Sequence, residues 1–233
     1  MGKVKIKRKS TFIDMTAMSD VTVLLLTFFM LTSTFLQKEP ITVITPSSVS
    51  EIKVPTMNLM TVLVSPEGNV FLSLAGDKDS LYSSEKMRAE LLLNVASEYN
   101  KIHSNKIEFT QAEVDKFSKT NMFGVSIAEL KGWLDMPQDK MDEYIDPSKN
   151  KKAGIPIDMN ENLDKPNEFQ IWMRAAYNSS DANLQAAMKS GEGIAIKADK
   201  GTPYSKIQVV MDNLQTLKMN KFSLMTALKS EED

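Results

Sequence analysis

The sequence predicts a single transmembrane α-helix followed by an α+β domain, and three observations lead to this fold class. The first is an uncharged apolar run, VTVLLLTFFMLTSTFL, at residues 21–36. The second is a pair of short β-rich runs on either side of a turn, and the third is a β-α-β pattern near the end of the chain. With 42% hydrophobic residues among 233, the chain suits one span and one domain rather than several spans.

Residues 13–36 form the predicted transmembrane helix. These 24 residues contain neither Pro nor Gly. At about 1.5 Å per residue they extend about 36 Å, enough to cross a hydrocarbon layer about 30 Å thick. A secretory signal peptide is the main alternative, but its apolar core is shorter and a small-residue cleavage site follows it. No such site occurs before Gln37, so we expect the segment to remain as an anchor.

A basic cluster precedes the predicted span and sets its orientation. Its members are Lys3, Lys5, Lys7, Arg8 and Lys9. The positive-inside rule places residues 1–12 in the cytoplasm and the domain on the other side, which we expect to be the periplasm. Because the cluster adjoins an apolar run, topology explains it better than nucleic-acid binding. The absence of cysteine excludes disulfides and cysteine-ligated metals.

Asp20 is the main candidate functional residue. An ionisable side chain within a membrane segment indicates a functional site. A carboxylic acid in a medium of low dielectric constant can alternate between neutral and charged forms near physiological pH, as an ion carrier requires. The alternative is that Asp20 caps a shorter helix that begins at Val21 and stays in water.

Three threonines share the expected helix face of Asp20. Thr16 lies one turn before it, and Thr27 and Thr34 lie seven and fourteen residues after it. Their hydroxyls could form a polar stripe that guides water or protons. Alternatively, they bond to carbonyls of their own helix or help helices to pack.

Residues 37–56 are predicted to be an extended tether, because Pro40, Pro46 and Pro55 resist helix formation. The domain then covers residues 57–233. It begins with a hairpin, in which residues 59–64 and 70–74 flank the turn sequence SPEGN. A helix over residues 84–100 follows, with apolar residues on one face in steps of four.

Residues 102–191 carry a weaker pattern, with helices expected at 111–119, 127–144 and 168–176 and a polar loop at 146–167. Trp133 and Trp172 are expected in the core, and His103, the only histidine, at the surface without a metal or catalytic role. The closing unit comprises a strand at 193–197, a helix with Thr202 as N-cap, and a strand at 222–225. The apolar face expected for that helix comprises Ile207, Val210, Met211, Leu214 and Leu217.

The block FIDMTAMSDVTVLLLTFFMLTSTF, residues 12–35, resembles the membrane segment of the ExbD and TolR proteins. Two departures are Ala17, where the family usually has Pro, and Asp14, where it usually has Asn. The resemblance continues through Val54 and Pro55 of the tether, the Pro-Glu-Gly turn of the hairpin, and Ala198-Asp199 before the last helix. It covers residues 12 to about 100 and 192–228, and it makes residues 102–191 an insertion.

The resemblance implies a motor subunit in the inner membrane of Gram-negative bacteria, and not an enzyme. Two copies would lie within an ExbB-like polytopic ring, and Asp20 would carry protons, with Na⁺ as the other ion left open. The tether, including Val54 and Pro55, would bind a partner, and the domain would engage a TonB-like protein. The alternatives are a TolR-like subunit of the envelope-maintenance motor and a signal-anchored periplasmic binding domain. No cofactor, metal or nucleic acid is implied.

Overall fold

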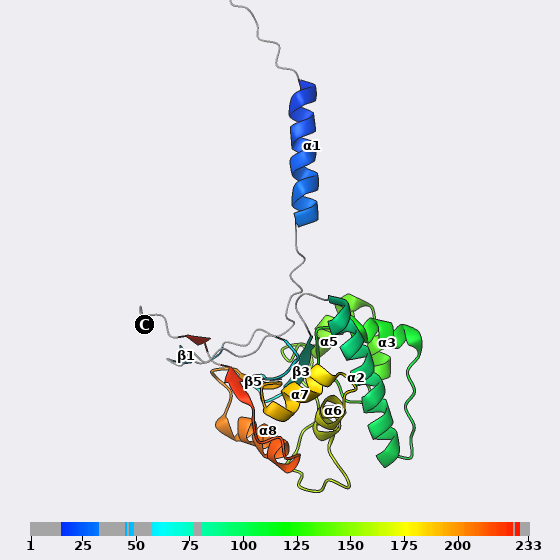
Figure 1. Ribbon diagram of the computed structural model, residues 1–233, viewed down its shortest axis with the longest axis vertical. Coiled ribbons are helices and arrows are strands. Elements are labelled where there is room, and N and C mark those ends of the chain that lie inside the picture. Colours follow the sequence, from blue (N-terminus) through cyan, green and yellow to red (C-terminus); the bar gives the residue numbers. More distant parts are fainter. Residues whose placement is uncertain are drawn as a thin grey trace, which may run out of the picture. The chain divides into compact units, whose positions relative to one another are not determined.

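The computed structural model describes residues 15–32, 45, 47–48, 57–76, 81–225 and 227–228. The chain divides into two compact units, residues 1–38 and residues 39–233. The described part of the first unit is one helix, α1, Met15–Thr32 (Figure 1). The second unit is a mixed α+β domain, as the sequence predicts.

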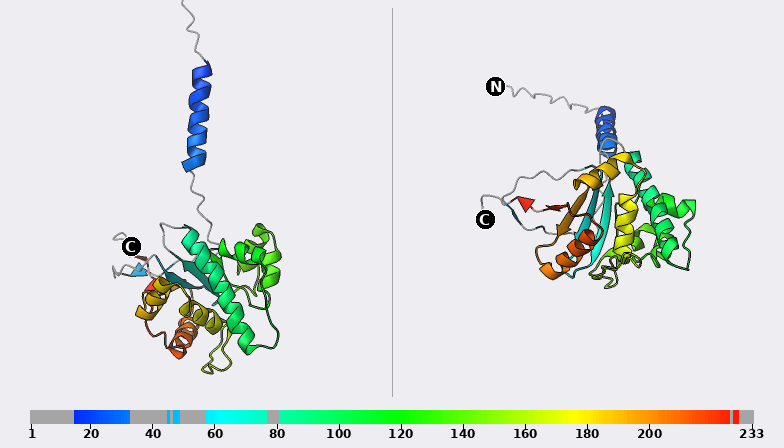
Figure 2. Two further views of the ribbon diagram at one scale, coloured as in Figure 1. Left: turned by 45° about the vertical axis from the view of Figure 1, so that its right-hand side comes forward. Right: turned by 60° about the horizontal axis from the view of Figure 1, so that its bottom comes forward.

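A five-stranded sheet with the order β4-β3-β2-β5-β6 forms the centre of the domain (Figure 2). The strands are β2 (Leu59–Val64), β3 (Val70–Ala75), β4 (Met122–Phe123), β5 (Ile194–Ala198) and β6 (Ser223–Met225). β2 and β3 are antiparallel, and β4 pairs antiparallel with β3. β5 pairs parallel with β2, and β6 pairs parallel with β5. The sheet therefore joins residues that lie more than 100 positions apart.

The predicted hairpin is confirmed, with a register from Leu59 opposite Ala75 to Val64 opposite Val70. In its turn, the Ser65 N–H donates to the Asn69 carbonyl at 3.0 Å, and the Gly68 N–H donates to the Ser65 carbonyl at 2.9 Å. Gly68 has φ +88°, a left-handed conformation that glycine adopts without steric cost. The turn sequence thus sets where β2 ends and where β3 begins.

The predicted helix after the hairpin is also confirmed and is longer than expected: α2 covers Leu81–Ile102. Its expected apolar face is buried at Met87, Leu91 and Val95. α2 packs against β3 and against α6 (Glu168–Tyr177). Alternate β2 residues Met60 and Val62 are fully buried in the core shared by the strands and these helices.

The segment predicted as one helix at 127–144 forms two, α4 (Leu130–Asp135) and α5 (Gln138–Ile145). The break occurs because Met136 precedes Pro137, and a residue before proline avoids the helical conformation. Met136 has φ −72° and ψ 152°, which is extended.

The helices α3 (Gln111–Ser118) and α6 confirm two further predictions, and each begins with a capping box. In α3, Thr110 and Glu113 bond to each other's backbone N–H groups; in α6, Asn167 and Gln170 do the same. These reciprocal bonds satisfy N–H groups that the first turn of a helix otherwise leaves free.

A helix that the sequence analysis did not predict, α7, covers Ala182–Ser190. Asp181 caps it by accepting hydrogen bonds from the backbone N–H groups of Asn183 and Leu184, at 2.9 and 3.0 Å. Gly191 ends it with φ +88°. The sequence therefore contains both the N-cap residue and the glycine that ends the helix.

The closing unit has the predicted order, with α8 (Tyr204–Thr216) between the parallel strands β5 and β6. Val210 and Leu214 are buried, and Ile207, Met211 and Leu217 are partly buried. The prediction of Thr202 as N-cap is wrong: Pro203 holds that position. The Thr202 hydroxyl instead donates to the Ser65 carbonyl at 3.1 Å, because the chain here passes beside the hairpin turn.

Two short strands, β1 (Ser47–Ser48) and β7 (Ala227–Leu228), pair in parallel as a separate sheet. Most of the predicted tether, including Val54 and Pro55, lies outside the described residues.

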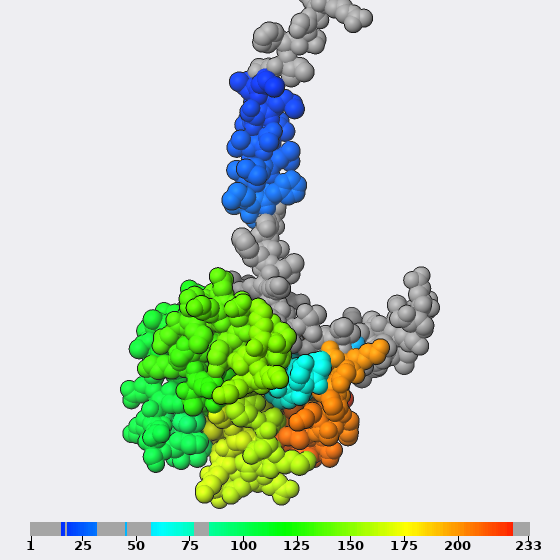
Figure 3. Space-filling model, turned by 180° about the vertical axis from the view of Figure 1, so that it is seen from behind, coloured from blue at the N-terminus to red at the C-terminus, as the bar shows by residue number. Residues whose placement is uncertain are grey.

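Residues 102–191 are part of the domain core rather than an appendage. They contribute β4 to the sheet, and Phe123 and Trp172 stand 4.5 Å apart between ring centroids. Both are fully buried, as is Trp133, whose indole N–H donates to the Met141 carbonyl at 3.0 Å. The predicted core positions of both tryptophans are confirmed. Figure 3 shows this segment, coloured green to yellow-green, beside the cyan hairpin.

Candidate functional site

Asp20 is the sixth residue of α1, which runs without interruption over 18 residues. The helix is continuous because Met15–Thr32 contains neither Pro nor Gly and is rich in Leu, Met and Phe. An N-cap residue lies before the first helical turn. The alternative in which Asp20 caps a helix beginning at Val21 is therefore wrong.

Thr16, Asp20 and Thr27 lie on the same side of α1, since the spacings of four and seven residues are close to one and two full turns. All three residues are exposed. The Thr27 hydroxyl donates to the Leu24 carbonyl at 2.9 Å, which agrees with the alternative of hydroxyls bonded within their own helix. Its oxygen retains acceptor capacity. Thr34 lies outside the described residues.

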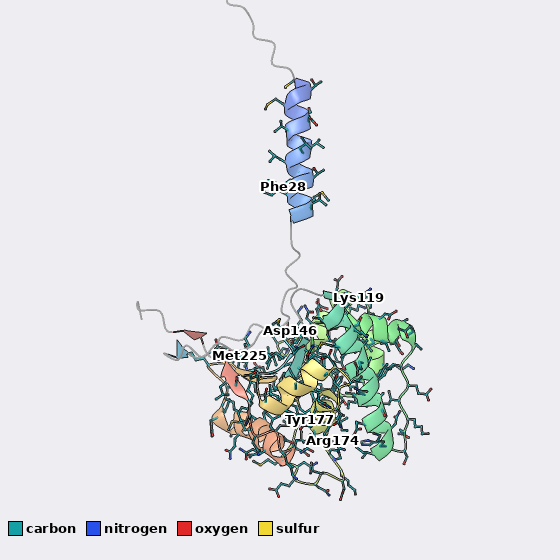
Figure 4. All side chains as sticks on the ribbon, viewed as in Figure 1. Phe28, Lys119, Asp146, Arg174, Tyr177 and Met225 are labelled. Carbon is teal, nitrogen blue, oxygen red and sulfur yellow. The ribbon has the colours of Figure 1, made fainter. Side chains whose placement is uncertain are left out.

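The large apolar side chains of α1 are exposed. The large hydrophobic side chains from Val21 to Leu31 are between 51% and 87% exposed. Figure 4 shows side chains extending from all around the helix, with Phe28 labelled. So many exposed apolar side chains are typical of a helix that is covered by apolar material, either protein or lipid.

The other predicted site residues are not described. The basic cluster Lys3, Lys5, Lys7, Arg8 and Lys9 precedes the described residues, as does Asp14. The predicted span also includes residues 33–36, which follow the described part of α1. Within the described ranges, no helix is both long enough and apolar enough to cross a membrane.

His103 is exposed at the end of α2, as predicted, and its ring stacks on that of Tyr99 with centroids 4.0 Å apart. Over the described residues, no cluster of three His, Cys, Asp or Glu side chains is arranged to hold a metal.

Arg88 is a buried charge that the sequence analysis missed. It lies on α2, is 4% exposed, and donates through Nη1 to the Thr120 carbonyl at 2.8 Å and to the Asn121 side chain. Its Nε donates to the Ser84 carbonyl at 3.2 Å. Burial lowers the pKa of the Arg88 guanidinium, and nearby Glu85 partly opposes this. Arg88 thus fastens α2 to the connection between α3 and β4.

A comparison with known protein families finds a match in the first half of the chain. Residues 7–116 match the family described as Biopolymer transport protein ExbD/TolR. This range includes α1, the hairpin, α2 and most of α3, and ends before the closing unit. No curated protein and no solved structure matches the chain. The match over residues 7–116 supports membership of the chain in the ExbD/TolR family.

Proposed function

We propose that this protein is an ExbD-like subunit of a motor driven by the proton-motive force, which energises TonB-dependent transport across the outer membrane. Members of the family are subunits of transport motors rather than enzymes. The observation that carries the proposal is the position of Asp20 inside a continuous helix whose large apolar side chains from Val21 to Leu31 are exposed.

Residues 13–36 would cross the inner membrane once, with residues 1–12 in the cytoplasm and residues 57–233 in the periplasm. Two features support this placement. The basic cluster before α1 has the charge bias of a cytoplasmic end. The exposed apolar side chains of α1 need a cover that the described residues of its own compact unit do not provide.

Asp20 would bind and release one proton as it faces first one side of the membrane and then the other. A charged carboxylate is costly where lipid surrounds it and is tolerated where water or a polar group of a partner contacts it. Alternation between these two surroundings would couple proton flow to movement of α1.

Thr16, Thr27 and Thr34 would form a polar stripe beside Asp20. The Thr27 hydroxyl satisfies its donor within the helix, which leaves its oxygen as an acceptor for water or for a protonated carboxyl. This assigns Thr27 a secondary role, since its removal would change the surroundings of Asp20 without removing the titratable group.

Two copies of α1 would pack within an ExbB-like polytopic ring, and the ring would cover their apolar surface. The tether, including Val54 and Pro55, would pass the movement of α1 to the periplasmic domain and contact a TonB-like protein. Family members associate with membrane partners of the ExbB/TolQ type, which supports the first of these contacts.

The test is the variant Asp20→Asn in cells that depend on this protein. Asn has nearly the same size and polarity but cannot titrate. We expect normal expression and co-purification with the membrane partner, together with loss of TonB-dependent uptake to the level of a deletion strain. Asp20→Glu keeps the titratable group and should retain part of the activity. Normal uptake by Asp20→Asn would contradict the proposal.

The same strains separate the two branches of the family. A TonB-type motor subunit should support uptake of large outer-membrane ligands, whereas a TolR-type subunit should support resistance to detergent. We expect the deletion to abolish the former and spare the latter. Replacement of residues 13–36 by a neutral membrane anchor should also abolish uptake; retained uptake would favour a merely anchored binding domain.

A further inference from the structure

A groove of about 310 Å³ lies in the periplasmic domain, away from α1 in the sequence, and the proposed ion carrier makes no use of it. It opens between the end of α2, the residues just after Ile155, and the first turn of α6. A volume near 300 Å³ is at the lower end of the range for ligand pockets.

One wall of the groove is aromatic. Tyr99 and His103 lie one helical turn apart, with ring planes 11° from parallel and centroids 4.0 Å apart. The His103 ring also lies within 3.3 Å of the Tyr99 carbonyl through Nδ1. The two rings stack face to face and support one another, so this wall needs little ordering when a ligand binds.

The other side of the groove carries the exposed ring of Pro156. Pro166 and Ile171 also line the groove and are buried. Hydrogen bonds fix the loop that carries Pro166: the Asn160 amide donates to the Lys165 carbonyl, and the Gln170 amide donates to the Asn160 carbonyl, both at 2.7 Å. A preformed groove lined by aromatic and proline rings suits an extended proline-rich segment.

The charges on the groove favour a basic ligand. Glu168 already accepts from the Ser126 hydroxyl at 2.7 Å and from the Ile127 N–H at 2.6 Å. Asp158 is exposed and accepts one bond from the Asn167 amide at 2.7 Å, which leaves acceptor capacity at the rim. His103 is the only basic side chain among the lining residues. Two carboxylates beside a single imidazole attract a Lys or Arg.

We propose that this groove binds a proline-rich segment of a partner protein in the polyproline II conformation, with a basic side chain of the segment beside Asp158. The prolines pack between the Tyr99–His103 rings and the exposed ring of Pro156. The inference is independent of proton transfer by Asp20, because it concerns residues of the periplasmic domain alone.

The test uses the full-length protein in detergent micelles and a fluorescein-labelled peptide of three Pro-Pro-Arg repeats, with fluorescence anisotropy as the readout. We expect saturable binding that His103→Ala and Tyr99→Ala each weaken at least tenfold. Tyr99→Phe keeps the ring and should bind as the wild type does. Asp158→Asn should weaken binding several-fold and reduce its dependence on salt. Tyr204→Ala is the matched control, since Tyr204 is 67% exposed on α8 and does not line the groove.

Three outcomes would overturn the proposal. Equal binding of a peptide with Ala-Ala-Arg repeats would mean that charge alone attracts the peptide. Unchanged affinity in His103→Ala, which alters an exposed side chain and leaves the core intact, would place binding elsewhere. Absence of saturable binding by the wild type would also contradict it. Failure of Asp20→Asn to stop transport would leave these results unaffected, so the two proposals can fail separately.

Discussion

Leucine has opposite surroundings in α1 and in the domain. Leu24 of α1 is 60% exposed, whereas Leu92 of α2 is fully buried. The domain covers its own apolar residues with strands and helices, so its folding explains their presence. The apolar surface of α1 calls for cover from outside its own helix, which points to lipid or a partner. Burial in the folded domain therefore explains the apolar residues of the domain, whereas the apolar residues of α1 need an explanation from function.

A second contrast separates the matched from the unmatched part of the chain. Residues 7–116 carry the family match and contain Asp20, yet residues 117–191 supply β4 and the buried aromatic cluster around Trp172. If function resides in α1 and stability in the domain core, variants should separate the two. The following predictions test the stability of the domain core, from the largest expected change to the smallest.

Trp172→Ala should destabilise the domain by about 3 to 5 kcal/mol, because it removes a fully buried ring that packs on Phe117 and Phe123. Denaturant unfolding measures this. The described structure gives the Trp172 indole N–H no hydrogen-bond partner, so Trp172→Phe should cost clearly less. A loss below about 1 kcal/mol for Trp172→Ala would mean that residues 117–191 are not part of the core.

Gly124→Ala should cost about 1 to 3 kcal/mol, because a Cβ atom there would stand 2.0 Å from Cδ1 of Phe71. Gly132→Ala is the matched control: a Cβ atom at Gly132, within α4, meets nothing within 4 Å. In a helix this change should stabilise by about 0.5 to 1 kcal/mol. Thermal unfolding of the two variants should therefore shift in opposite directions, and equal shifts would refute the packing described around Phe71.

Asp181→Ala should cost about 1 kcal/mol, because α7 loses the carboxylate that accepts from the N–H groups of Asn183 and Leu184. Asp181→Asn should cost less, since Asn is a comparable N-cap. The difference in unfolding free energy between the two variants isolates the cap. No difference would show that α7 is held by packing alone.

Tyr144→Phe should cost at most a few tenths of a kcal/mol, because its hydrogen bond to Glu129 lies at an exposed position. This bond raises the pKa of Tyr144. A raised folded-state pKa gives stability that is present below the ordinary tyrosine pKa of about 10 and is lost as the pH rises through the raised value. The stability difference between wild type and Tyr144→Phe should therefore shrink in that range; a difference that grows would contradict the bond.

Local patterns predicted much of the fold. The SPEGN turn between two β-rich runs specified the hairpin, and apolar steps of four specified α2, because these signals lie within a few residues of each other. β4 has only two residues, Met122 and Phe123, and forms because β3 offers an unpaired edge. Nothing in so short a run predicts strand pairing. α7 shows the opposite case: its Asp181 and Gly191 signals were present but lay in a polar segment with little apolar periodicity.

The candidate site was predictable for a different reason. Asp20 stands out because a carboxylate inside an apolar helix has no packing explanation. The helix bounds then removed the capping alternative, which sequence spacing alone could not do. Arg88 could not be predicted, since its burial depends on Thr120 and Asn121, which reach it only through the fold. The groove beside Tyr99 likewise joins α2 to residues more than 50 positions away.

The central claim is that Asp20 carries protons, and proton flux in reconstituted vesicles tests it most directly. The protein would be co-purified with its membrane partner, reconstituted with a pH-sensitive dye inside, and subjected to a membrane potential in sodium-free buffer. We predict proton uptake by the wild type, no uptake above empty vesicles by Asp20→Asn, and the same domain unfolding temperature for both. If a complex of the Asp20→Asn variant with the same composition took up protons as fast as the wild type does, that result would contradict the account.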